Sequence, residues 1–172
     1  MILCALASSA SADAGLSLLA HVGNLDGRSA STMAGDLELG ITDDRWQYFG
    51  ELAGGRAWIA DEIAGITARA GIGVRWRARS LELGRNASLD MTLEAVTGVE
   101  RYWWETGERR TRPDVGAGVG WQLRGHGFGT MRASARVVFA PSDPTLAVCR
   151  GDCPVRMSTT NAGLMAVIGF HR

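Results

Sequence analysis

The 172-residue chain has no lysine, only four prolines and three cysteines, and its 18 arginines are balanced by 18 acidic residues. Nucleic-acid-binding proteins usually carry an excess of basic residues on one face, so the zero formal charge argues against that class. No run of about 18 apolar residues follows the N-terminal segment, which excludes a membrane-spanning helix there. With 46% hydrophobic residues the chain is not disordered. A soluble β domain and a membrane β-barrel remain as classes.

The first fourteen residues have the composition of a secretory leader. Met1 to Ala14 combine a short apolar run with small-x-small sequences typical of a cleavage site, although the usual basic start is missing. We therefore expect a shortened signal peptide at residues 1–14 and a single β-barrel domain at residues 15–172. The alternative is a frayed strand of a cytosolic protein. Export would bring Cys149 and Cys153 into an oxidising compartment, where they can form a disulfide.

The dominant pattern along the chain has a period of two. From Ile66 to Arg79, apolar residues alternate with arginine, threonine and glycine at every position, whereas a helix would need a spacing of 3.6. The same period predicts eight strands and no helix. The expected strands are residues 16–22, 33–41, 46–52, 66–79, 87–95, 115–123, 131–139 and 164–170. Leu19, Val138, Met165 and Val167 break the alternation.

The connections between these strands alternate in length. We expect long ones at Asn24–Ser31, Gly54–Glu62, Arg101–Pro113 and Ala140–Arg156, and short ones at Thr42–Arg45, Ser80–Asn86 and Gly125–Gly127. An antiparallel meander with long connections at one end and short turns at the other is typical of a bacterial outer-membrane barrel. The even number of strands puts both termini at the end with the short turns, the periplasmic side.

The large aromatic residues indicate which face of the barrel meets lipid. Most have the apolar parity and fall near the strand ends, while alanine, valine, leucine, isoleucine and methionine occupy the middle. Two aromatic girdles around an aliphatic band are typical of a lipid-facing surface. The predicted girdle residues are Trp46, Tyr48, Trp76, Trp103, Trp121, Phe139 and Phe170.

The opposite parity combines glycine with charged residues, and we expect it to fill the barrel interior. An eight-stranded barrel has just enough room inside for side chains, and buried charges must pair with one another. The predicted interior charge network consists of Glu38, Glu51, Arg69, Arg75, Arg77, Asp90, Glu94, Arg132 and Arg136. The alternative is a soluble lipocalin-like barrel with this face in water and the apolar face inside.

Taken together, strand number, connection lengths, girdles and the near-terminal Phe170 make residues 15–172 resemble the small OmpA/OmpX-type outer-membrane barrels of Gram-negative bacteria. The resemblance is one of architecture, and here His171 and Arg172 follow the aromatic residue that usually ends such chains. It implies that the partners are outer-membrane lipid, lipopolysaccharide and the barrel-assembly machinery. It also implies a membrane-anchoring structural role, with loop-mediated binding or minor pore activity.

Residues for chemistry are sparse. The three histidines, His21, His126 and His171, are scattered, whereas a catalytic triad or zinc site needs several groups that converge. We predict no catalytic residue, no metal site and no cofactor. Two alternatives remain open: a barrel enzyme that modifies lipid A, with His21 near Ser17 or Asp36, and a secreted soluble barrel that binds an apolar ligand.

Two connections carry further signals. Cys149 and Cys153 flank an Arg-Gly-Asp tripeptide, which we interpret as part of a disulfide-stabilised surface loop in preference to a receptor-binding motif. In Arg101–Pro113 we expect the aromatics Tyr102 to Trp104 to lie at the headgroup level and the arginines to meet lipid phosphates. The ligand of the outer loops is not predicted.

Overall fold

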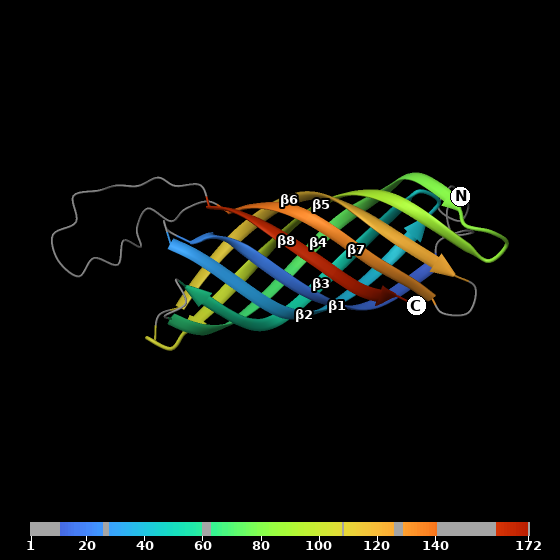
Figure 1. Cartoon of the computed structure of the whole chain (residues 1–172). Helices are drawn as coiled ribbons and strands as arrows, with labels where there is room; N and C mark the ends of the chain where they lie inside the picture. Colours follow the sequence, from blue (N-terminus) through green and yellow to red (C-terminus); the bar gives the residue numbers. More distant parts are fainter. Residues whose placement is uncertain are drawn as a thin grey trace, which may run out of the picture.

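The computed structural model describes residues 11–25, 28–59, 63–107, 109–125, 129–140 and 161–171, and within them it forms one closed barrel (Figure 1). Each strand pairs antiparallel with the next, and β1 pairs with β8. This confirms the predicted eight-stranded up-and-down meander. None of the described residues belongs to a helix long and apolar enough to cross a membrane. The strands are β1 (Ser11–Leu25), β2 (Arg28–Asp43), β3 (Trp46–Ile59), β4 (Ile63–Glu82), β5 (Ala87–Trp104), β6 (Arg109–Gly125), β7 (Gly129–Ala140) and β8 (Asn161–His171).

The two ends of the barrel differ in which chain ends and strand connections lie there. At the terminal end, β1 begins and β8 ends, next to the β2–β3, β4–β5 and β6–β7 connections (Figure 1). The opposite end, here called the loop end, has the β1–β2, β3–β4, β5–β6 and β7–β8 connections. Strand β1 starts at Ser11, which pairs with Thr42, so the barrel includes residues that the sequence placed in the leader segment 1–14.

Three of the four connections predicted to be long are short. Residues 26–27, 60–62 and 105–108 separate the paired strands at the loop end, and only residues 141–160 form a long connection in the sequence. The prediction was wrong because backbone pairing continues beyond the apolar segments. For example, Arg101 pairs with Thr111 and Trp103 pairs with Arg109, so most of the expected Arg101–Pro113 loop consists of paired strand residues of β5 and β6. The β4–β5 connection is likewise confined to residues 83–86.

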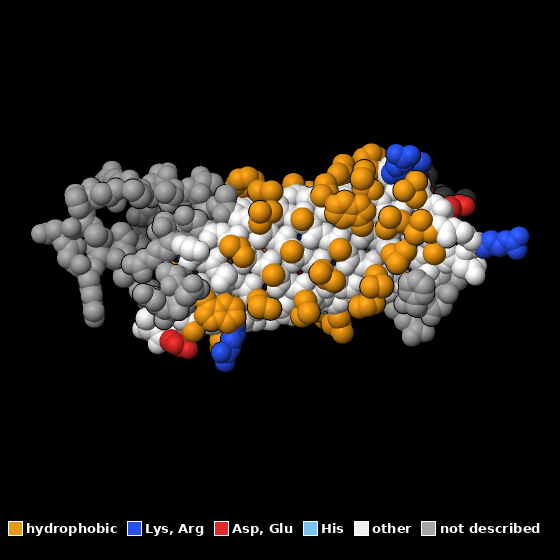
Figure 2. All heavy atoms as spheres, viewed as in Figure 1, with side chains coloured by type: hydrophobic (Ala, Val, Ile, Leu, Met, Phe, Trp, Pro, Cys, Tyr) orange, Lys and Arg blue, Asp and Glu red, His pale blue; other side chains and the backbone are white. Residues whose placement is uncertain are grey.

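Because residue types alternate along each strand, the barrel wall has an apolar outer face and a polar inner face. Apolar side chains of every strand point outward and are exposed, with Leu18 at 72% and Ile72 at 67%. On the face shown in Figure 2 they spread over the middle of the barrel, whereas the charged side chains visible there lie toward its ends. The polar parity points inward, and Arg136 is completely buried. The barrel therefore has its hydrophobic surface outside and its ionised groups inside.

The residues that break the alternation form a small apolar cluster inside the barrel. Leu19, Val138, Met165 and Val167 are buried and pack with Ala34. A second buried cluster, Ala57, Tyr102 and Trp104, lies on the loop-end halves of β3 and β5. The exceptions on β1, β7 and β8 are thus interior side chains that fill space where the strands carry no charge.

Glycine at position 118 is required by close packing inside the barrel. A Cβ at Gly118 would lie 2.3 Å from the carbonyl oxygen of Ala135 and 2.9 Å from both Cα and Cγ of Arg136. We expect Gly118→Val to lower the free energy of unfolding by about 1–3 kcal/mol, because overpacking displaces Arg136 or the β7 backbone. Urea titration of the protein in lipid vesicles measures this loss.

The adjacent residue supplies the matched control. Ala117 points outward and is exposed, so Ala117→Val should change the free energy of unfolding by less than about 0.5 kcal/mol. Equal losses for the two valine variants would contradict the assignment of the faces of β6.

Candidate functional site

A continuous chain of ion pairs runs through the barrel interior. Four arginines and four carboxylates alternate along it, so its formal charges cancel. All eight side chains are buried, each at most 4% exposed. We call this set the ion-pair chain; in order of contact its members are Asp114, Arg69, Glu51, Arg136, Glu94, Arg75, Glu38 and Arg132.

Several links of the ion-pair chain have bidentate or bridging geometry. Arg69 donates from Nε and Nη2 to the two oxygens of Asp114 at 3.0 and 2.7 Å. Arg75 donates from Nη1 and Nη2 to the two oxygens of Glu38 at 3.0 and 3.1 Å. Such paired N–H groups match the geometry of a carboxylate. The interior therefore contains ionised groups that are compensated by specific partners.

Arg136 is the central bridge of the ion-pair chain. Its Nη1 donates to Glu51 and its Nε donates to Glu94, both at 2.8 Å. Arg75 joins the other oxygen of Glu94 at 3.2 Å, and its Cζ lies 4.4 Å from the centre of the Phe49 ring. The Arg69–Glu51 contact joins this bridge to the Arg69–Asp114 pair, and the Arg132–Glu38 contact forms the other end of the chain.

The structure places all nine predicted network residues at the interior or its mouth, and it divides them into two groups. Seven belong to the ion-pair chain. Asp90 Oδ2 instead forms ion pairs with Arg124 Nε, at 2.9 Å, and with Arg77 Nη1, at 3.7 Å, and the side chain of Arg77 is 26% exposed. This second group sits at the terminal end, where β4 and β5 also shift register between Arg77 and Arg79.

Sequence reasoning missed several interior residues. Asp114 was not included, and Glu100 and Arg112 fell at or beyond the ends of the predicted strands. Glu100 accepts from Thr67 at 3.0 Å and from Arg112 at 3.1 Å. The parity that makes Asp90 and Glu94 interior also includes Glu100 and Tyr102, so extending the period of β5 would have identified them.

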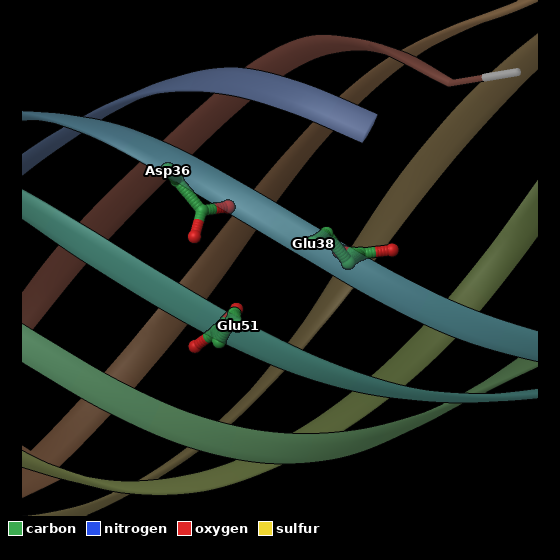
Figure 3. Close-up of side chains that lie close together, drawn as sticks. All are labelled: Asp36, Glu38 and Glu51. Carbon is green, nitrogen blue, oxygen red and sulfur yellow. The ribbon is translucent and has the colours of Figure 1, made fainter. Parts of the chain in front are cut away.

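Three carboxylates on neighbouring strands come close enough to suggest a cation site. Asp36 and Glu38 of β2 and Glu51 of β3 point into the barrel, and one oxygen of each lies within 4.8 Å of the others (Figure 3). However, both oxygens of Glu38 and both of Glu51 already contact arginines. Both oxygens of Asp36 lack a hydrogen-bond partner, and Glu51 Oε1, which also has none, lies in ion-pair contact with Arg69. The donor set that remains does not fit a metal ion, which needs several free oxygen ligands.

The histidines do not form a catalytic arrangement among the described residues. His21 is buried on β1 with Thr32 and Met165 as its register partners. The hydroxyl of Ser17 and both oxygens of Asp36 have no hydrogen-bond partner, so neither residue orients His21. His171 is buried at the terminal end, with Nδ1 3.8 Å from carboxylate oxygens of Asp13 and Glu38.

The predicted girdle residues all point outward. Trp46 and Trp76 lie next to each other at the terminal end, with ring centroids 6.2 Å apart. The expectation for the β5–β6 segment was partly wrong, since Tyr102 and Trp104 are 2% and 5% exposed and stack inside the barrel at 5.3 Å. They follow the inward parity of β5, and only Trp103 between them faces outward. The other outward girdle residues are Tyr48, Trp121, Phe139 and Phe170.

The soluble alternative is excluded by the same burial pattern. A lipocalin-like barrel would bury its apolar parity and expose its charges, and this barrel does the reverse. The predicted disulfide Cys149–Cys153, the Arg-Gly-Asp sequence between those cysteines and the turn residue His126 lie outside the described residues.

Comparison with known proteins identifies the fold. No family model and no curated protein sequence matches the chain. Among solved structures, Neisserial surface protein A matches with a TM-score of 0.57 and 11% identity, over 95% of this chain and 99% of that one. The N-terminal β-barrel domain of Pseudomonas aeruginosa OprF gives 0.51 and 10%, over 95% and 100%. Ail, the attachment invasion locus protein of Yersinia pestis, gives 0.47 and 15%, over 96% and 100%. The first two of these matches, together with the closed eight-stranded barrel, show that the chain has the fold of the small eight-stranded outer-membrane barrels.

Proposed function

We propose that this protein is a bacterial outer-membrane barrel that anchors itself through its outward apolar belt and presents its loop end to the exterior. The observation that carries the proposal is the inverted distribution of side chains. Large hydrophobic residues such as Leu16, Leu18 and Ile72 are about 70% exposed, while Glu38, Arg75 and Arg136 are at most 1% exposed. A contiguous apolar surface of this extent is unfavourable in water but suits the hydrocarbon region of a bilayer.

The interior supports a structural role over transport. The ion-pair chain crosses the lumen, and the cavity at its terminal-end mouth, lined in part by Gln47, Arg75 and Thr92, has a volume of about 10 Å³, room for about one water molecule. The stacked rings of Tyr102 and Trp104 further narrow the lumen at the loop end of the barrel. Minor pore activity therefore requires rearrangement of buried ion pairs, so we expect a low and intermittent single-channel conductance in planar bilayers.

The same role defines the partners. The belt contacts outer-membrane lipid and, on the outer side, lipopolysaccharide, and an assembly partner of the barrel-assembly type would insert the chain. Any binding of a further partner would then fall to the connections at the loop end, above all to residues 141–160.

Fractionation of cells that express the chain tests the anchoring role. We expect the protein in the outer-membrane fraction and a shift in gel mobility between unheated and boiled samples, because a closed barrel resists unfolding in detergent. Recovery as a detergent-free soluble monomer would overturn the proposal.

A further inference from the structure

Among the residues that the structure describes, the exposed charged side chains differ between the two ends of the barrel. At the terminal end, the exposed side chains Asp43, Asp44 and Glu82 are interspersed with exposed Arg45, Arg79 and Arg85. At the loop end, the exposed charged side chains that the structure describes are Arg56, Arg101, Arg109 and Glu105. Among the described residues of the loop end, three exposed arginines therefore stand against one exposed glutamate.

Two of these arginines form a compact patch with a tryptophan. Trp103 of β5 lies directly opposite Arg109 of β6, and Arg101 lies opposite Thr111. This register places the Cα atoms of Arg101 and Arg109 on a diagonal, about 7–8 Å apart. Because both side chains share the outward parity with Trp103, they project from one small area of the surface.

The patch is partly preorganised for a ligand. The Arg101 guanidinium lies over the Trp103 ring, with Cζ 5.3 Å from the ring centroid, which restricts its rotamers. Arg109 forms no ion pair with any residue that the structure describes. An exposed arginine at the edge of an apolar belt is stabilised by reaching an anion in the interface.

We propose that Arg101, Trp103 and Arg109 bind the phosphate group of a lipid headgroup in the outer leaflet. Guanidinium groups donate paired N–H bonds to phosphate oxygens, and two arginines on neighbouring strands can contact one phosphate from two sides. Trp103 lies at the level where indole rings favour the boundary between headgroups and acyl chains. The site rests on the proposed membrane orientation and specifies the chemistry of the lipid that the loop end selects.

Retention of a defined lipid by the full-length protein tests the site. The protein is inserted into phosphatidylcholine nanodiscs that contain a small fraction of phosphorylated lipid A, and bound lipid is quantified by native mass spectrometry after release from the disc. We expect the Arg101→Gln/Arg109→Gln variant to bind this lipid about 30-fold more weakly than the natural chain, about 5.4-fold for each arginine. The Arg45→Gln/Arg79→Gln variant removes two exposed arginines of the terminal end and should bind as the natural chain does.

Further arms identify the source of the phosphate and guard against misfolding. Excess inorganic phosphate should not displace the lipid, and the same glycolipid without phosphate should not be retained. The Arg101→Lys/Arg109→Lys variant keeps the charges but loses the paired N–H geometry, so it should bind more tightly than the glutamine variant and more weakly than the natural chain. Equal losses for the two glutamine variants, or equal retention of the phosphate-free glycolipid, would overturn the site. Failure of the natural chain to enter any bilayer would instead refute the membrane-anchoring role.

Discussion

Arg136→Met is expected to lower the free energy of unfolding by about 3–5 kcal/mol, the cost of breaking a buried ion pair by removing one partner. Arg136 is completely buried and donates to both Glu51 and Glu94. Its removal leaves four carboxylates facing three arginines in the ion-pair chain. Methionine has a similar length and preserves most of the packing, so the loss reports on charge. Denaturant titration in lipid vesicles, monitored by tryptophan fluorescence, measures it.

A double-mutant cycle separates the charge from the volume. Glu94→Gln removes the negative charge next to Arg136, and the remaining Asp114–Arg69–Glu51 and Arg75–Glu38–Arg132 segments then hold three arginines and three carboxylates. We expect the double variant to be more stable than the sum of the single losses predicts, by about 0.5–3 kcal/mol. As a control, Arg79→Met replaces an exposed arginine and should change stability by less than about 0.5 kcal/mol. Additive losses would show that Arg136 and Glu94 do not interact energetically.

Ala70→Arg is expected to destabilise the barrel in a bilayer by about 2–4 kcal/mol, the cost of an arginine at the midplane of the lipid-facing surface. Ala70 is exposed on the outward parity of β4, and its register partners Leu52 and Val99 are exposed apolar residues. The new guanidinium has no acidic neighbour among the described outward residues around it, so it would have to extend toward an interface. Unfolding titrations in vesicles give the magnitude.

The matched control lies near the edge of the same belt. Thr111 is also outward and exposed, but it is close to the start of β6 at the loop end. Thr111→Arg should cost about 0–1 kcal/mol, because headgroups and water solvate the charge there. If both substitutions cost the same, the apolar belt does not lie across the hydrocarbon region as proposed.

The sequence alone predicted the barrel because its dominant constraint is local. A period of two on eight segments, with aromatic residues near the strand ends, follows from a surface that must be apolar outside and polar inside. The same period predicted that Glu38, Arg75 and Arg136 face inward. The partners could not be predicted, because Arg136 of β7 contacts Glu51 of β3 only when the strands close into a barrel and long side chains cross the lumen.

Strand ends were the weakest part of the prediction. Beyond the apolar belt the outward residues become polar, so Arg101, Thr111 and Arg109 resemble a loop in sequence although they form regular ladder pairs. Backbone hydrogen bonding needs no particular side chain, and nothing in the composition marks where it stops. Tyr102 and Trp104 were misplaced for this reason, since their aromatic character indicated an interface while their parity placed them inside.

Site-directed spin labelling along β4 tests the central claim, the outward apolar face, most directly. In a background with the three native cysteines replaced by serine, nitroxides are attached at Ala68, Ala70 and Ile72, which are exposed outward positions, and at inward Thr67. In vesicles we predict frequent collisions with oxygen at the outward sites, highest at Ala70, little access to a water-soluble nickel reagent there, and restricted motion at Thr67. Nickel access at Ala70 equal to that at the exposed turn residue Arg85 would contradict the account.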